Sequence, residues 1–209
     1  MGTKIVTRSL KKDFCDSIAL RSAINAATQT RSKKYHVYVD SLTKKKKQEV
    51  ILFWKNKLKK FIKPYMKNRK NDTDFVTDVN RLKKSINRKY KDCFYGENGI
   101  RIAQCQKSLS VYLKWLWCLG IAKFEPPVCP IDRNVLNQCF VNLDRKNDKE
   151  NKDFLKKINK AGGWGQIDCL KDYKKLLDIA SAISNKANLS IAVWELSFFN
   201  NIIENEEHD

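Results

Sequence analysis

The chain has 209 residues, enough for one domain or two small domains packed together. It carries 42 Lys and Arg against 23 acidic residues, so the formal net charge is +19, more than solubility requires. With 42% hydrophobic residues, the composition excludes a disordered basic tail. No stretch reaches the ~20 apolar residues of a membrane span, and the first residues lack the apolar core of a signal peptide. We therefore expect an intracellular, cytoplasmic protein, associated with the nucleoid if bacterial.

The excess charge lies entirely in the first half of the chain. Residues 1–91 hold 26 basic and 7 acidic residues, whereas residues 92–209 hold 16 of each. Such an asymmetry is typical of a nucleic-acid-binding or anionic-membrane face, although the lysine-rich composition of an AT-rich genome also produces it. We favour nucleic acid, and we divide the chain into a basic helical half, 1–91, that binds the DNA backbone and a half, 92–209, that carries the candidate catalytic segment.

Cysteine and histidine usage excludes several classes of site. The seven Cys are an odd number without a C-x2-C pair, and the only histidines are His36 and His208. We therefore expect free thiols, no metal site and no Ser-His or Cys-His catalysis. Gly162-Gly163-Trp164-Gly165 lacks the preceding strand and the following Lys of a phosphate-binding loop, so we interpret it as a turn.

The apolar period in the first half is helical. The pattern predicts an Ala-rich helix at 13–29 built around Phe14 and Ile18, a helix at 45–67, and a helix at 73–91 with Thr73 as its N-cap. Residues 35–39 form the only alternating stretch, which is too short to found a sheet.

The second half continues the pattern. A helix at 102–119 is apolar around most of its circumference and must be central, and Pro126, Pro127 and Pro130 then force an extended loop. Further helices are predicted at 132–141, 152–160, 168–185 and 190–203. No repeat of 20 to 50 residues recurs, so we expect an all-α, compact bundle of about eight helices. We place four tryptophans of the helical stripes in the core: Trp54, Trp115, Trp117 and Trp194.

Lysines gather at the start of the 45–67 helix and along one side of it. Cations at a helix N-terminus oppose the helix dipole, which makes a purely structural role less favourable. We interpret them as a phosphate track, while a localisation signal and a solvated helix start remain alternatives. The residues of this track are Lys44, Lys45, Lys46, Lys47, Lys55 and Lys59.

Segment 96–138 carries the most informative order of features. It begins with the turn Gly96-Glu97-Asn98-Gly99, continues into a helix opening near Lys107, passes the proline loop and reaches Pro130-Ile131-Asp132 at the start of the next helix. This order resembles the helix-hairpin-helix DNA glycosylase superfamily, in its oxoguanine glycosylase and lyase branch. The match covers about 40 residues in order, and the helical context agrees across the rest.

The resemblance implies a DNA glycosylase-like fold and roles for particular residues. The hairpin, here Asn98 and Gly99, would offer backbone amides to a phosphate; a helix-start lysine, here Lys107, would be the nucleophile; and the carboxylate would be Asp132. We add Arg133, beside that carboxylate, to the DNA contacts. Members with an iron–sulfur cluster carry four closely spaced cysteines that this chain lacks, so we expect no cofactor.

The chemistry of these residue types is consistent with those roles. Cleavage of an N-glycosidic bond builds positive charge on the sugar, which a carboxylate stabilises, and an amine can form a Schiff base with it. The alternatives remain an ordinary N-cap for Asp132 and a surface position for Lys107, with Lys114 as the fallback amine.

Two aromatic residues on predicted loops, Trp164 and Phe124, are candidates for stacking on a flipped base, or else are lids folded back on the core. We therefore expect a monomeric DNA glycosylase, with or without lyase activity, that excises a damaged or modified base from duplex DNA. Defence against phage with modified DNA is one sub-hypothesis. The alternative from another class is a non-catalytic, basic helical DNA- or RNA-binding protein.

Overall fold

The computed structural model describes residues 2–29, 36–144 and 147–206. Over these residues the chain forms eight α-helices and no sheet, so the all-α prediction is confirmed. The alternating stretch contributes a single antiparallel bridge between Tyr38 and Phe94, and Tyr35 lies outside the described residues.

The helices follow the predicted order closely. Their bounds are α1 Gly2–Thr28, α2 Lys44–Lys67, α3 Asp72–Tyr90, α4 Ile102–Cys118, α5 Arg133–Asn142, α6 Lys149–Lys160, α7 Leu170–Lys186 and α8 Ile191–Glu206. Two 3-10 turns, η2 Lys91–Cys93 and η3 Trp164–Gln166, lie between α3 and α4 and between α6 and α7. Only the first prediction is far off, because α1 begins at Gly2 rather than at 13.

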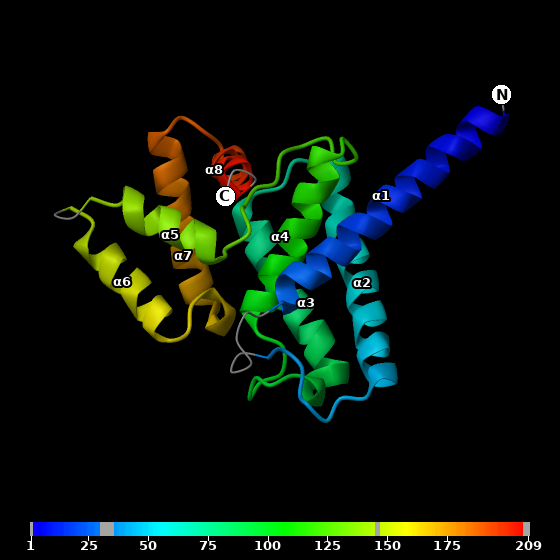
Figure 1. Cartoon of the computed structure of the whole chain (residues 1–209), viewed down its shortest axis with the longest axis horizontal. Coiled ribbons are helices and arrows are strands. Elements are labelled where there is room, and N and C mark those ends of the chain that lie inside the picture. Colours follow the sequence, from blue (N-terminus) through cyan, green and yellow to red (C-terminus); the bar gives the residue numbers. More distant parts are fainter. Residues whose placement is uncertain (1, 30–35, 145–146, 207–209) are drawn as a thin grey trace.

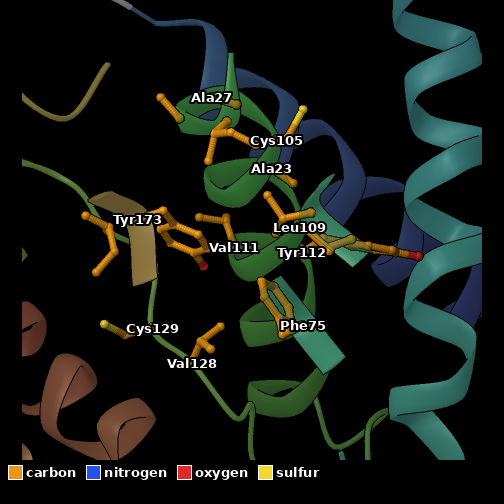
Figure 2. Packing of buried hydrophobic residues seen from close by; sticks show 14 of the residues in the cluster. Ala23, Ala27, Phe75, Cys105, Leu109, Val111, Tyr112, Val128, Cys129 and Tyr173 are labelled. Atoms are coloured by element: carbon orange, nitrogen blue, oxygen red, sulfur yellow. The ribbon is translucent and has the colours of Figure 1, made fainter. Parts of the chain in front are cut away.

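Helix α4 lies between two groups of helices. Figure 1 shows α1 and α2 on one side of it, α5, α6 and α7 on the other, and α3 crossing behind it. Every residue from 102 to 113 is buried, which agrees with a central helix. The small side chains of Ala19, Ala23 and Ala27 are buried along α1, and they allow its backbone to approach α4 closely. Figure 2 shows Ala23 and Ala27 beside Cys105, and Val111 near Tyr173 of α7.

Buried polar bonds fix α4 to both groups. The indole nitrogen of Trp54 on α2 donates to Ser108 Oγ at 3.1 Å. At the helix start, the amide of Ile102 donates to Asp168 Oδ1 at 3.1 Å, and Asp168 also pairs with Lys83 of α3. The first turn of α4 therefore takes its capping carboxylate from a residue far along the chain.

Three local predictions were wrong. The N-cap of α3 is Asn71, whose side chain accepts from the Asp74 amide at 2.7 Å, rather than Thr73. Phe14 is 67% exposed because the N-terminal half of α1 projects beyond the other helices. Trp115 is 38% exposed on the last turns of α4, whereas Trp54 and Trp194 are buried as expected.

The seven cysteines form no disulfide, and Cys93, Cys105, Cys129 and Cys139 are buried. In the described part of the chain no helix is long and apolar enough to cross a membrane. The same residues contain no group of three or more His, Cys, Asp or Glu side chains placed to hold a metal ion.

Candidate functional site

The structure brings Lys107 and Asp132 together. Lys107 Nζ donates to Asp132 Oδ2, and the two side chains are only 10% and 17% exposed. Asp132 is the N-cap of α5, where its Oδ1 accepts from the Val135 amide at 3.0 Å. One carboxylate oxygen therefore caps a helix while the other holds the ammonium group.

The order of features in segment 96–138 suggested that Lys107 stands at a helix start, and it does not. Helix α4 opens earlier, with Arg101 as its N-cap, and Lys107 lies in the second turn. The difference arises because Ile102 to Gln106 are themselves buried and helical, so the apolar stripe begins before the polar run around Lys107.

A glutamine next to Lys107 fixes the chain just before Asp132. The fully buried Gln106 side chain donates from Nε2 to the Ile131 carbonyl at 2.7 Å and accepts from the Ile131 amide at 3.1 Å. Both backbone groups of Ile131 are thus satisfied by one side chain, which sets the position of Asp132. No local pattern predicts this role, because a glutamine inside an apolar helix has many possible partners.

Trp164 lies over the ion pair. Its ring centroid is 5.7 Å from Lys107 Nζ, within the range of a cation–π contact. The two residues before it, Gly162 and Gly163, have φ of 109° and 81°, a conformation that L side chains rarely adopt. The next carbonyl, of Gly165, accepts from Gln104 Nε2 at 3.2 Å, which ties the turn to α4. The half-buried Trp164 ring packs against the core on one side.

A second buried ion pair lies one heptad further along α4. Lys114 Nζ contacts both carboxylate oxygens of Glu195 on α8, at 2.7 and 3.0 Å, and Glu195 is 1% exposed. Burial raises the pKa of the Glu195 carboxyl, and Lys114 opposes that shift. The charges of Asp132 and Lys107 also act on the Glu195 pKa, in opposite directions, so the two pairs are neighbours electrostatically.

Sequence reasoning identified Lys114 but missed Glu195. One feature of the sequence could have identified it. Glu195 is an acidic residue within the apolar stripe of Ile191, Trp194 and Phe198, which places α8 against the core. An acid on such a stripe needs a buried partner, and the lysine one heptad after Lys107 supplies it.

In the predicted hairpin, some of the backbone groups expected to bind a phosphate already form hydrogen bonds within the protein. The Gly99 amide donates to the Gly96 carbonyl at 2.8 Å, and the Asn87 side chain accepts from the Ile100 amide at 2.8 Å. Asn87 also donates to the Asn98 carbonyl at 2.6 Å. A Cβ on Gly99, at φ 79°, would lie 2.4 Å from Asn87 Oδ1, so this turn requires glycine there. Asn98 is exposed, whereas the Gly99 amide is occupied within the turn.

Two further predicted site residues, Arg133 and Phe124, differ in their exposure. Arg133 is exposed at the start of α5, directly after Asp132 in the chain. Phe124 is half-buried in the proline loop, where Lys123 Nζ lies 5.5 Å from its ring centroid. In the residues that the structure describes, no cation–π or ring contact is found between Phe124 and the Lys107–Asp132 pair.

The predicted lysine track does not lie beside the ion pair. Helix α2 buries its apolar stripe against α3 and α4, and Figure 1 shows α2 and α5 on opposite sides of α4. Lys46 pairs with Glu49 at 3.2 Å, Lys59 pairs with Asp16 at 2.7 Å, and Lys47 Nζ lies 4.9 Å from the Tyr38 ring centroid. In the described structure no ion pair is found for the remaining three, Lys44, Lys45 and Lys55.

Comparison of the chain with profiles of protein families, with curated proteins and with solved structures finds no match.

Proposed function

We propose that the protein binds DNA and excises a damaged or modified base, with Lys107 and Asp132 carrying the chemistry. The observation that supports this most strongly is the ion pair itself. An amine and a carboxylate 25 residues apart in sequence lie on two helices, in hydrogen-bond contact, under an aromatic ring on a glycine turn. These are the groups that cleavage of an N-glycosidic bond requires.

The pair accounts for each proton in the reaction. Only a neutral amine is a nucleophile, so one proton passes from Lys107 Nζ to the contacting oxygen of Asp132 before attack. The Nζ–C1′ bond then forms as the C1′–N bond to the base breaks, and the departing base takes the proton from Asp132. The carboxylate is thereby restored while positive charge develops on the sugar, which it stabilises.

The lyase step follows from the same covalent adduct. The new secondary ammonium gives a proton to O4′ as the sugar C1′–O4′ bond opens, which leaves a protonated Schiff base and a free 4′ hydroxyl. Removal of a C2′ proton then breaks the bond between C3′ and the 3′ phosphate oxygen, and water releases Lys107.

Trp164 and Arg133 supply the contacts that a flipped nucleotide needs. A base taken out of the duplex stack is met by an aromatic face, and Trp164 lies within reach of Lys107. The exposed guanidinium of Arg133, next to Asp132, is placed to bind a neighbouring phosphate. In this proposal duplex DNA therefore lies against the junction of α4, α5 and η3.

The test is borohydride trapping on duplex DNA that contains assorted modified bases or an abasic site. The wild type should form a covalent complex, Lys107→Gln should form none, and Asp132→Asn should release base at least 100-fold more slowly. Lys114→Gln is the matched control, since Lys114 is also a paired lysine on α4, and it should still be trapped. Circular dichroism confirms that each variant is folded. Equal trapping of Lys107→Gln and wild type would refute the lyase assignment, and full base release by Asp132→Asn would refute the role of the carboxylate.

A second candidate is a non-catalytic nucleic-acid-binding protein. The observation that favours it is the burial of Lys107 in the second turn of α4, where its pair with Asp132 also joins α4 to α5. This candidate predicts duplex binding that weakens steeply with salt, without any product. Product formation by the wild type that is lost in Lys107→Gln would eliminate it.

A further inference from the structure

A group of lysines and aromatic rings lies where the first half and middle of α2 meet the last turn of α3. Phe53 and Tyr90 pack edge to face, with ring centroids 5.3 Å apart and an interplanar angle of 69°. Lys46 Nζ is 5.2 Å from the Tyr90 centroid, and Lys57 Nζ is 5.0 Å from the Phe53 centroid. Lys89 Nζ is 5.4 Å from Phe53 and 5.3 Å from Tyr90. We call these five residues the lysine–aromatic cluster.

The cluster carries three lysines, and across the described ranges only one of them has an acidic partner. Glu49 pairs with Lys46 at 3.2 Å, and within the described residues no ion pair is found for Lys57 or Lys89. Three ammonium groups around two adjacent rings repel one another, and cation–π attraction offsets that only modestly at an exposed site. An anion bound between the lysines would remove the repulsion.

The cluster is accessible and separate from the candidate excision site. The Lys46 side chain is 48% exposed, Lys89 is exposed, and Phe53 is half-buried beside the exposed Leu52. Figure 1 shows α2 and α5 on opposite sides of α4, so the cluster lies away from the pair that Lys107 forms at the start of α5.

We propose that the lysine–aromatic cluster binds a segment of single-stranded nucleic acid. In that complex the three lysines contact successive phosphates, and one base stacks on the Phe53 ring that Lys57 and Lys89 now cover. A duplex also offers phosphates, but its bases are stacked on one another, so it leaves the aromatic rings without a role. Proteins that hold single strands combine a basic surface with aromatic rings in this way. The proposal does not depend on base excision at Lys107.

The experiment measures binding of a fluorescein-labelled 12-nucleotide oligothymidine, and of a duplex of the same length, by fluorescence anisotropy at several salt concentrations. Phe53→Leu should weaken single-strand binding by about 5- to 100-fold, the range that loss of one stacked base produces, and Phe53→Tyr should restore it. Duplex binding by Phe53→Leu should change by less than about twofold, since no base stacks in the duplex complex.

The lysines are tested separately, so that the proposal does not rest on the Phe53→Leu variant alone. Lys57→Gln should lower the slope of log affinity against log salt by about 0.7, the value for one lost phosphate contact on a single strand. The control is Lys152→Gln, which removes a lysine of α6, outside the cluster, whose Nζ lies 5.3 Å from the ring centroid of Phe140 on α5. It should leave both affinity and slope unchanged.

Two results would overturn the proposal. One is single-strand affinity that is unchanged in Phe53→Leu. The other is an equal loss for single strand and duplex, which would assign the cluster to backbone electrostatics alone. Trapping at Lys107 is measured on the same preparations, so failure of the excision proposal is scored independently of this one.

Discussion

The side chain of Gln106 provides the sharpest test of how the candidate site is built. Replacement by leucine keeps the volume nearly constant but leaves the Ile131 amide and carbonyl without partners in a fully buried position. Each buried polar group that loses its partner costs about 1–3 kcal/mol, so Gln106→Leu should reduce the free energy of unfolding by about 2–6 kcal/mol.

Gln104 is the matched control for this measurement. It is the same residue type on the same helix, 3% exposed, and it donates one hydrogen bond, to the Gly165 carbonyl at 3.2 Å. Gln104→Leu should therefore cost about 1–3 kcal/mol, roughly half the loss in Gln106→Leu. Urea unfolding followed by tryptophan fluorescence and far-ultraviolet circular dichroism gives both values. A Gln106→Leu variant no less stable than Gln104→Leu, with the same denaturant dependence, would show that the double hydrogen bond does not hold the loop before Asp132.

Three further predictions concern burial. Because burial raises the pKa of Glu195 above its ordinary value of 4.5, the native state binds this proton more tightly than the unfolded state. The stability of the wild type relative to Glu195→Gln should thus be greatest below pH 4.5 and fall as the pH rises through the native pKa. Urea unfolding of both proteins across that range measures this difference. A difference that grows with pH would contradict a raised pKa for Glu195. Leu116→Ala should lose about 2–5 kcal/mol, whereas Trp115→Ala on the exposed side of the same turn should lose much less, and thermal and urea unfolding compare the two. A thiol reagent should label Cys118 and Cys169 rapidly in the native protein and the buried thiols only after unfolding, and mass spectrometry of the labelled peptides identifies them.

The helices were predictable because their apolar residues recur at helical spacing. Val50, Trp54 and Leu58 define the buried stripe of α2, and the same period located α3, α4 and α7 within a few residues. The period could not locate the start of α1. Residues 10–14 of α1 are exposed, so no buried stripe marks a face there and the pattern became visible only at the buried alanines.

The candidate site was predictable only in part. Lys107 and Asp132 were paired in advance only through the resemblance that the order of features in segment 96–138 carries, and the structure brings the two side chains into contact. Glu195 and Gln106 act through bonds to residues 81 and 25 positions away, and nothing local specifies such partners. The capping of Ile102 by Asp168, 66 residues later, is the same kind of long-range bond.

The position of α4 decides how the two proposals relate to each other. Adjacent residues of this helix face different partners, since Ser108 accepts from Trp54 of α2 while Lys107 holds Asp132 of α5. The bond from Trp54 therefore meets α4 at the residue that directly follows Lys107. The Trp54→Phe variant removes the bond to Ser108 while it keeps an aromatic ring in the core, so it separates the two functions. If the surfaces are coupled through α4, this variant should change trapping at Lys107 while its affinity for single-stranded oligothymidine stays the same, and equal retention of both would show that the two surfaces act independently.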